Sequence, residues 1–486
     1  MIEHIAPDQR PGRLTAAGLP TDRARRFLDA QAAAVEHFDE ARRKGAAPTL
    51  DRDAARLREA ILAGRGLLAA LPLRSRRAPT ERAAGHAITQ LIADASWRFF
   101  RLHAVPLYRT LTDAGRRELR IDALFDAAAR ALPDLLPSAA ELAAESEQMQ
   151  ADKDGLEIPQ GLFASQVLAD PAAGSHLVRT MLRPRADSLE RLAEFRRTGR
   201  ADLGPVRVEV DGETGYVYLH NERYLNSEDD TTVGPLEIAF DLLLLHPAIR
   251  MGVLRGSVMS HPKYAGQRVF CSGINLTRIY QGKQSYVSFL LRNMSMHAKL
   301  YRGVLPEWEP NELVPPDDQP EQTLEKPWVA VVERFAIGGG CQLLLVVDYV
   351  IAEKGAYFSL PARKEGFLPG TSNLRLPRFV GERAARQAIM FDKVFHADSD
   401  EGRMLANEVV EPERMEQAVR DCVANAIGSG MVSAGGNRKA IRVQTEPMET
   451  FRKYLATYAY EQAFCHLSDQ LIANLERHWN AKARKL

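Results

Sequence analysis

The chain has 486 residues, which is longer than one ordinary domain and predicts two regions. Hydrophobic residues make up 45% and charged residues 26%, a globular composition that excludes a disordered chain. Lys and Arg (64) nearly balance Asp and Glu (63), so the charge gives no indication of a nucleic-acid partner.

The cysteines and the N-terminal segment bear on the compartment. Residues 1–14 are polar and lack the apolar stretch of a secretory signal. No segment approaches the roughly 18 apolar residues of a membrane span. Cys271, Cys341, Cys422 and Cys465 form no CxxC pair, which favours a reducing compartment over zinc or disulfides. We therefore expect a cytoplasmic protein with no membrane partner.

Residues 1–203 predict an all-helical domain, because Ala, Arg, Leu and Glu dominate and β-branched residues are rare. Ser138 with Glu141, and Asp187 with Glu190, have capping-box spacing and predict helix starts. Apolar residues recur at helical spacing in three segments, Ala55–Leu71, Ala87–Leu107 and Leu119–Leu132. We find no chemistry-bearing motif in this domain.

Residues 204–430 predict an α/β core, because strand and helix patterns alternate. Val206–Val210 and Gly215–Leu219 alternate around an Asp-Gly turn, which predicts a hairpin. Helices are predicted at Tyr286–Tyr301 and from Gly339. Further strands are predicted at Ile249–Gly256, Arg268–Phe270, Trp328–Val332, Val350–Glu353 and Tyr357–Ser359.

Two segments flank or interrupt this core. Residues 303–326 are rich in Pro, Glu and Asp and predict a surface loop. Residues 431–486 form a C-terminal segment that is helical from Glu446 and is predicted to make oligomer contacts.

Two glycine turns carry the chemical signal. Val269–Leu276 runs from a strand into Gly273, and Phe335–Leu343 runs from a strand through three glycines into a helix. Glycines let backbone N–H groups approach a ligand, and a helix N-terminus favours negative charge there. Two such turns facing each other predict an oxyanion hole. By itself, a tight strand-to-helix turn explains the triple glycine equally well.

Together with Gly366–Gly381, these turns resemble the crotonase (enoyl-CoA hydratase/isomerase) superfamily over residues 205–430. The resemblance implies a ββα spiral core and a homo-oligomer, a trimer or hexamer. It also implies that the N–H groups of Ile274 and Gly339 form an oxyanion hole for an acyl-CoA carbonyl. Arg268 falls near the position that contacts the CoA moiety.

The chain departs from the hydratases of this superfamily at two positions. Where they carry catalytic glutamates, this chain has Gln342 and Ala362. Neither side chain exchanges protons near neutral pH, so addition of water to a double bond has no acid/base pair. The sequence therefore predicts that enolate stabilisation is kept and hydration is lost.

A branch of the superfamily resembles this chain more closely, namely dioxygenases of antibiotic biosynthesis that act on (3,5-dihydroxyphenyl)acetyl-CoA without metal or flavin. The resemblance implies that an enolate reacts with dioxygen to give an arylglyoxylate and CoA. The acyl-CoA and dioxygen are then the partners, and CoA is part of the substrate rather than a cofactor. The stretches that carry this resemblance include Glu157–Phe163, Met181–Pro184, Ala239–Leu242, His246–Ala248, Gly252–Gly256 and Gln342–Val346.

This branch implies roles for individual residues. Gln342 matches a glutamine beside the reacting carbon, and Glu228 matches a carboxylate that contacts a ring hydroxyl. Leu276 and Phe367 fall at the dioxygen pocket. The remaining positions that match substrate-binding residues are Glu222, His261, Pro262, Lys263, Tyr264, Arg268, Ser272, Gly273, Asn275, Leu276, Arg292 and Asn293.

Two of these positions differ from the branch. The branch has a pair of arginines where this chain has Arg292 followed by Asn293, and isoleucine where it has Phe367. Asn293 in place of the second arginine bears on which hydroxylation pattern of the substrate's aryl ring is recognised. Phe367 in place of isoleucine narrows the dioxygen pocket. No metal site is predicted, since the 12 histidines form no HExxH motif.

Two other functions use the same features. A crotonase-fold thioester hydrolase or decarboxylase would use the oxyanion hole without dioxygen. A non-catalytic CoA-binding protein would keep only the fold. Gln342 and Ala362 alone fit all three functions, and the extended match through Glu228 and Leu276 favours the dioxygenase.

Overall fold

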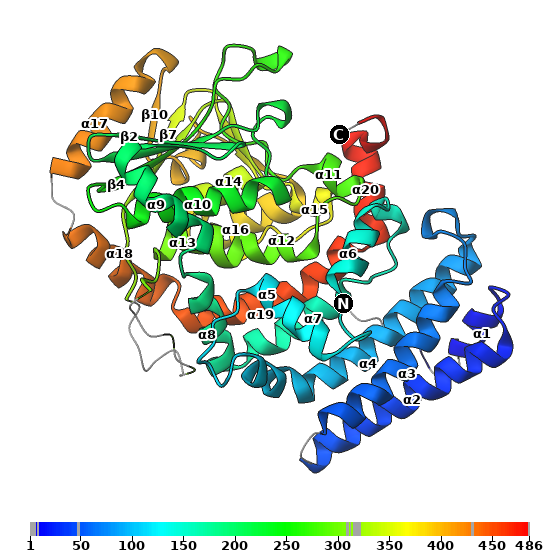
Figure 1. Cartoon of the computed structure of the whole chain (residues 1–486). Coiled ribbons are helices and arrows are strands. Elements are labelled where there is room, and N and C mark those ends of the chain that lie inside the picture. The colour runs from blue at the N-terminus through cyan, green and yellow to red at the C-terminus, as the bar shows by residue number, and fades with distance from the viewer. Residues whose placement is uncertain are drawn as a thin grey trace.

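A helical region precedes a mixed α/β core, and three helices follow it (Figure 1). The computed structural model describes residues 6, 9–45, 49–307, 311, 313, 322–428 and 432–484. The helices of the N-terminal region are α1 (Gln9–Thr15), α2 (Thr21–Lys44), α3 (Leu50–Leu68), α4 (Pro79–Leu111), α5 (Ile121–Ala131), α6 (Ala139–Ser146), α7 (Ile158–Ala169), α8 (Pro171–Met181) and α9 (Ala186–Thr198).

The described residues of the core form two sheets. A seven-stranded sheet has the order β1-β2-β3-β4-β5-β7-β10, antiparallel from β1 to β3 and parallel from β3 to β10. A three-stranded sheet has the order β6-β8-β9. The strands are β1 (Arg200–Asp202), β2 (Val206–Asp211), β3 (Thr214–Leu219), β4 (Met251–Gly256), β5 (Trp328–Val332), β6 (Phe335–Ile337), β7 (Tyr349–Glu353), β8 (Tyr357–Ser359), β9 (Val394–His396) and β10 (Glu408–Val410).

Helices of the core and of the C-terminal segment cover these sheets. A π-helical turn, η5 (Arg292–Met296), joins α12 to α13. The helices are α10 (Asp230–Leu245), α11 (Leu276–Tyr280), α12 (Tyr286–Leu291), α13 (His297–Arg302), α14 (Gly339–Leu344), α15 (Ala362–Glu365), α16 (Ser372–Phe391), α17 (Met415–Gly428), α18 (Val432–Thr445), α19 (Met448–His466) and α20 (Asp469–Trp479).

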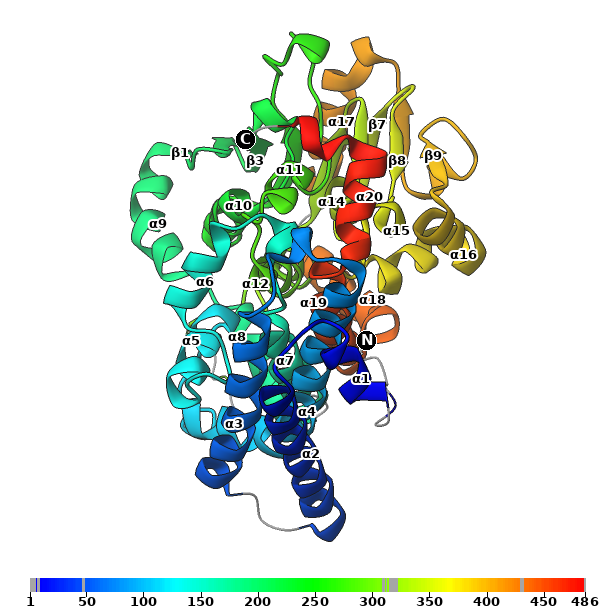
Figure 2. The ribbon, with the colours of Figure 1, turned by 90° about the vertical axis from the view of Figure 1, so that its right-hand side faces the viewer.

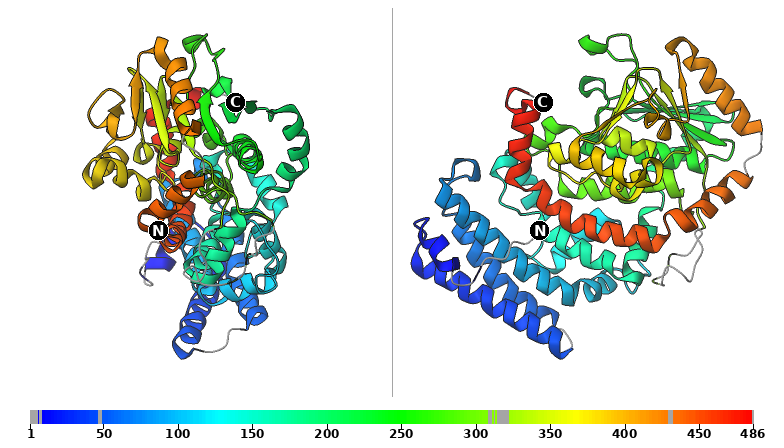
Figure 3. Two further views of the ribbon diagram at one scale, coloured as in Figure 1. Left: turned by 90° about the vertical axis from the view of Figure 1, so that its left-hand side faces the viewer. Right: turned by 180° about the vertical axis from the view of Figure 1, so that it is seen from behind.

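Helix α19 runs between the core and the N-terminal helices (Figures 1 and 3), and α7 packs along it. A Cβ built on Gly161 of α7 would lie 2.5 Å from the Cβ of Ala463 and 2.8 Å from the Ala459 carbonyl oxygen. The small residues therefore let the two helix backbones approach closely. One hydrophobic cluster includes buried residues of the N-terminal helices, α12 and α19, so these elements share a core.

Buried charges tie the N-terminal region to the core. The ammonium group of Lys299 lies 2.7 Å from carboxylate oxygens of both Glu237 and Asp241, and all three side chains are buried. Arg120, before α5, donates to Glu237 over 2.7 Å. Each buried charge thus has an opposite charge within hydrogen-bonding distance, as burial of charge requires.

Most predicted elements are confirmed. The α/β class with helices at both ends is as predicted, and so is the hairpin, whose strands β2 and β3 pair antiparallel. Ser138 and Glu141 form the predicted capping box of α6. The predicted helix at 286–301 contains the π-helical turn in its middle. Much of the predicted loop at 303–326 lies outside the described residues.

Two local predictions are wrong. Arg268–Phe270 forms no regular strand, because Arg268 makes only an isolated bridge with Val258. The helix start predicted at Asp187 is confirmed, since α9 begins at Ala186, but the capping contact is wrong because the Asp187 carboxylate pairs with Arg185, 2.8 Å away. Among the described residues, no helix is both long enough and apolar enough to cross a bilayer.

A buried carboxylate holds the C-terminal helices against the core. Glu446, between α18 and α19, accepts hydrogen bonds from Arg375 over 2.8 and 2.9 Å and from Arg378 over 3.0 Å. Arg302 donates to the same carboxylate over 3.3 Å. Burial alone would raise the pKa of Glu446, but these arginines lower it to about 2.

We predict that Glu446→Gln destabilises the protein by about 3–5 kcal/mol at pH 7, because it leaves buried guanidinium groups without a counter-charge. The Glu446 contribution is present above pH ~4.5 and is lost as the pH falls towards 2. Urea unfolding at pH 7 and pH 3 measures both effects.

The control for this substitution is Glu382→Gln, which removes an exposed ion pair with Arg386 on α16. It should change the free energy of unfolding by less than about 1 kcal/mol. Equal effects of the two substitutions would contradict a structural role for the Glu446 cluster.

Candidate active site

The two predicted glycine turns lie side by side. Cys271 forms a parallel bridge with Ala336, and the Ile337 N–H donates to the Cys271 carbonyl over 3.0 Å. Because the two segments run in the same direction, the turns that follow them emerge at the same edge. A Cβ built on Gly273 would lie 2.8 Å from the Ile337 carbonyl oxygen and 3.3 Å from the Gly339 nitrogen.

Glycine is required at the first turn for two reasons. Gly273 has φ of 90°, a conformation that side chains disfavour, and its α-carbon faces the second turn closely. The Glu228 N–H donates to the Gly273 carbonyl and the Asn275 N–H donates to the Glu228 carbonyl, each over 2.8 Å. These two bonds fix the peptide groups on either side of Ile274.

The N–H groups of Ile274 and Gly339 have no acceptor within the part of the chain that the structure describes. Gly339 is the first residue of α14, where backbone donors have no intrahelical partner. The first bond of this helix runs from the Gln342 N–H to the Gly338 carbonyl, over 3.0 Å. Two donors are therefore available at one site.

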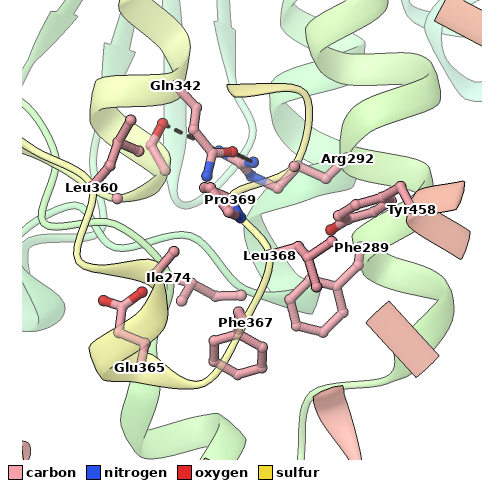
Figure 4. Close-up of a pocket in the computed structure, with 14 residues that line it drawn as sticks. Ile274, Phe289, Arg292, Gln342, Leu360, Glu365, Phe367, Leu368, Pro369 and Tyr458 are labelled. Carbon is pink, nitrogen blue, oxygen red and sulfur yellow. Dashed lines mark hydrogen bonds between the residues drawn. The ribbon is translucent and has the colours of Figure 1, made fainter. Parts of the chain in front are cut away.

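Both residues border a cavity of about 30 Å³, which is small compared with ligand pockets of roughly 300–1,000 Å³. Figure 4 shows Gln342 and Arg292 pointing toward one another, and Phe367 close to Phe289. The lining residues are Ile274, Phe289, Arg292, Gly338, Gly339, Gln342, Leu360, Ala362, Glu365, Phe367, Leu368, Pro369, Gly370 and Tyr458.

Arg292, in the π-helical turn, organises the polar side of the cavity. Its guanidinium lies 2.6 Å from Glu228 Oε2 and donates to the Gly339 carbonyl over 3.2 Å. It also donates to Gln342 Oε1. Because arginine only donates, the oxygen of the Gln342 amide must face it and the nitrogen must face away. No acceptor for that nitrogen is found among the described residues, so Gln342 adds a further available donor.

Glu228 lies behind this cavity rather than on its wall. Its Oε1 atom is buried and has no hydrogen-bond partner within the described parts of the chain. A Cβ on Gly339 would overlap Glu228 Oε2 and lie 2.8 Å from Arg292 Nη2. Glycine at 339 therefore makes room for the ion pair of Glu228 and Arg292.

Glu365 is the carboxyl group on the cavity wall. It is 8% exposed, and burial raises its pKa to about 8, with a further contribution from Asp392. Ala362, one helical turn earlier, lines the same cavity. Sequence reasoning assigned no role to Glu365, because its pKa shift depends on a buried position that local sequence does not reveal.

Phe367 separates this cavity from a larger one. Its ring lies 5.5 Å from that of Phe289 and 6.4 Å from that of His466. Phe367 also lines a cavity of about 580 Å³ between the N-terminal helices and α20. Figure 2 shows α20 beside α15, and residues of both helices line this larger cavity. The bulky ring at 367 thus forms a wall shared by the two cavities.

Other predicted residues support the turns instead of lining the cavity. Ser272 Oγ donates to the Tyr224 carbonyl over 2.9 Å, and Asn275 caps α11 by accepting from the Arg278 N–H over 3.2 Å. Leu276 is buried in the cluster that contains Phe367. Asn293 packs against Gly370, where a Cβ would overlap its amide. These contacts hold the backbone on which the site is built.

A third group lies on the loop after β4 or, in the case of Glu222, contacts that loop from the turn after β3, and it is apart from the cavity lining. Glu222 accepts from Ser260 Oγ over 2.6 Å, and Arg268 donates to the Gly256 carbonyl over 3.1 Å. Tyr264 packs edge-on against Phe335, with ring centroids 5.7 Å apart. His261, Pro262 and Lys263 belong to this group and are partly or fully exposed.

Comparison with known proteins agrees with this architecture. The sequence profile of the Enoyl-CoA hydratase/isomerase family matches residues 319–470. A (3,5-dihydroxyphenyl)acetyl-CoA 1,2-dioxygenase of Amycolatopsis orientalis is 44% identical over 400 residues, covering 82% of this chain and 89% of the relative. The chain belongs to the enoyl-CoA hydratase/isomerase family.

Other known proteins are similar to parts of the chain. A crotonyl-CoA hydratase of Syntrophomonas wolfei subsp. wolfei is 26% identical over 227 residues, covering 46% of this chain and 76% of the relative. The crystal structure of an enoyl-CoA hydratase from Mycobacterium avium subsp. paratuberculosis K-10 is 18% identical, with a TM-score of 0.47. It covers 59% of this chain and 99% of the hydratase.

Several lining residues of this family member were missed by sequence reasoning. Tyr458 comes from α19, in the segment predicted to make oligomer contacts, and in this chain it closes one side of the cavity. Phe289, Leu360 and Leu368 are apolar residues whose pattern signals only burial. Among the described residues, no group of three or more His, Cys, Asp or Glu side chains is placed to hold a metal ion.

We predict that Gly339→Ala displaces the Glu228–Arg292 pair and lowers the melting temperature, since the added methyl group overlaps the carboxylate. Gly234→Ala in α10 is the control, because a Cβ there meets nothing within 4 Å and alanine favours a helix by about 0.5–1 kcal/mol. Thermal unfolding of both variants measures the difference. An unchanged melting temperature for Gly339→Ala would contradict the tight fit.

Proposed function

We propose that this protein is a cofactor-independent dioxygenase that converts an arylacetyl-CoA thioester, such as (3,5-dihydroxyphenyl)acetyl-CoA, and dioxygen into an arylglyoxylate and CoA. The observation that carries the proposal is the pair of available N–H groups, of Ile274 and Gly339, on a cavity whose Gln342 is neutral. The 44% identity to the named dioxygenase of Amycolatopsis orientalis supports the same substrate class.

The first step is formation of an enolate. In this proposal the thioester oxygen accepts from the Ile274 and Gly339 N–H groups. The α-hydrogens lie between an aryl ring and a thioester and are acidic for carbon-bound hydrogens. Donors that bind the enolate oxygen more strongly than the carbonyl oxygen increase that acidity further. The free Gln342 amide nitrogen supplies an additional donor near the reacting carbon.

The enolate then reacts with dioxygen. The enolate passes one electron to dioxygen, and the resulting radical and superoxide combine to form a bond between the α-carbon and oxygen, which gives an α-peroxide. The terminal peroxide oxygen attacks the thioester carbonyl and expels the CoA thiolate. Loss of the second α-hydrogen and cleavage of the O–O bond give the α-keto acid. Both oxygen atoms of dioxygen are retained in the arylglyoxylate, and no external reductant is consumed.

Apolar and polar walls have separate roles in this proposal. Phe367 lines the cavity with apolar surface, and Leu276 is buried in the same hydrophobic cluster behind it. In this proposal the apolar surroundings favour dioxygen and exclude the water that would protonate an enolate. In this proposal the unpartnered Glu228 Oε1, which lies behind the cavity, accepts from a ring hydroxyl once the cavity has opened to admit the aryl group. Since the cavity is only about 30 Å³, binding of the aryl group requires side chains to move. In this proposal Phe367, which forms one wall, is one of the side chains that move.

Oligomerisation and the domain division remain predictions. We propose a trimer or hexamer, with a helical domain at 1–203, a crotonase-like core at 204–430 and a C-terminal segment at 431–486. The surface group of Glu222, Arg268 and residues 261–264 is proposed to contact substrate, including its CoA moiety.

We expect the purified protein to consume dioxygen and release CoA in equal amounts with (3,5-dihydroxyphenyl)acetyl-CoA, in chelator-treated buffer without added flavin. An oxygen electrode and a thiol reagent measure the two quantities. CoA release without oxygen uptake would indicate a hydrolase. Binding without turnover would indicate a non-catalytic CoA-binding protein, and loss of activity on metal removal would contradict cofactor independence.

Gln342→Glu is expected to reduce oxygen uptake by about 10²-fold. The carboxylate keeps its contact with Arg292 but removes an N–H donor and places negative charge beside the enolate. Hydration of crotonyl-CoA should not appear, because Ala362 leaves the position of the second hydratase glutamate without an acid/base group. Oxygen uptake and absorbance of the enoyl thioester measure the two activities. Unchanged oxygen uptake would exclude a role for the Gln342 amide.

A further inference from the structure

One ionisable side chain in the cavity remains unassigned. Glu365 is the carboxyl group among the described residues that line it, and it shares the cavity with Ile274, Gly339 and Gln342. Its Oε1 atom lies 4.0 Å from a Cβ built on Gly338, next to the second N–H donor. Figure 4 shows the Glu365 side chain near Ile274, across the cavity from Gln342.

The Glu365 carboxyl is not committed to a structural contact. Within the described parts of the chain, it has no hydrogen bond or ion pair, unlike Glu228, which Arg292 engages. A buried acid without a partner is costly and is uncommon outside functional sites.

The backbone holds Glu365 in this position. Helix α15 ends at Gly366, which has φ of 92°, and the N–H groups of Gly366 and Phe367 both donate to the Ala362 carbonyl, over 2.8 and 3.0 Å. A Cβ on Gly366 would lie 2.9 Å from the Leu471 α-carbon, so α20 packs tightly against this turn. The carboxyl group is therefore presented by a rigid turn.

The other ionisable groups described near Glu365 are paired or do not act as bases, so Glu365 is the base available in this cavity. Arg292, across the cavity, is paired with Glu228, and Tyr458 of α19 is a phenol whose pKa burial raises above its usual range. Asp392, after α16, lies 3.6 Å from Lys364. Helix α20 presents Leu471 and Asn474 to this turn, and Asn474 donates to the Arg363 carbonyl over 3.1 Å.

We propose that Glu365 accepts the α-hydrogen of the arylacetyl-CoA substrate as a proton, an inference that rests on the proposed function. The carboxylate takes the proton and becomes a neutral acid, while the C–H electron pair forms the enolate whose charge lies on the thioester oxygen. The proton then passes to the departing CoA thiolate or to solvent. Ala362 leaves the carboxyl group free of a neighbouring acid in this turn.

The electrostatics suit this role. Burial raises the pKa of Glu365 to about 8, which makes the carboxylate a stronger base than an exposed glutamate. Below about pH 8, the fraction of Glu365 in the carboxylate form increases about tenfold for each rise of one pH unit. Proton abstraction should therefore accelerate with pH and level off at about pH 8.

The test is exchange of the α-hydrogens for deuterium in D₂O under anaerobic conditions, followed by mass spectrometry of (3,5-dihydroxyphenyl)acetyl-CoA. This assay reports enolate formation without the dioxygen step. We expect Glu365→Gln to slow exchange by at least about 10²-fold and to abolish the rise towards pH 8, with substrate affinity retained. Glu365→Asp should restore part of the rate.

Glu145→Gln is the matched control, because Glu145 is also buried with a raised pKa but lies outside this cavity, on α6. It should exchange at the wild-type rate. Wild-type rates in Glu365→Gln, with oxygen uptake intact, would overturn the role of Glu365 and leave the proposed function standing. A wild-type profile with no inflection near pH 8 would also overturn it. If the wild-type protein showed no exchange and no oxygen uptake, both the role of Glu365 and the proposed function would be overturned.

Discussion

The close approach of two backbone turns is the constraint on which the site depends. Gly273 and Gly339 face each other so closely that a Cβ on the first would lie 3.3 Å from the nitrogen of the second. This fit requires the parallel bridge between Cys271 and Ala336, and it leaves the Ile274 and Gly339 N–H groups on one cavity. Backbone donors held in this way need no reorganisation when negative charge develops.

Buried polar groups distribute the charge around these turns. Arg292 neutralises Glu228 and orients the Gln342 amide, so the wall beside the donors carries no free negative charge. Glu365 stands across the cavity, where burial keeps its proton affinity high. In the proposed mechanism, this arrangement separates stabilisation of an enolate from removal of a proton, and it differs from the hydratase pattern because positions 342 and 362 carry no acid.

The helices outside the α/β core close the site. Helix α19 contributes Tyr458 to the cavity and packs against α7 through Gly161, Ala459 and Ala463. The Glu446 cluster anchors the start of that helix to α16. In the proposed mechanism, coverage by these helices limits access of water to a reactive carbanion, which is a physical reason for the helical regions on either side of the core.

Local sequence determined the α/β core, the helical flanks, both glycine turns and the absence of glutamate at 342 and 362, because these follow from periodicity, backbone freedom and side-chain chemistry. Family resemblance named Ile274, Gly339 and Gln342. Tertiary structure alone decided that Arg292 contacts both Glu228, 64 residues earlier in the chain, and Gln342, 50 residues later. It also decided that Tyr458 closes one side of the cavity. It also decided that Glu365 is buried with a raised pKa, because burial and long-range contacts depend on packing between segments far apart in the chain.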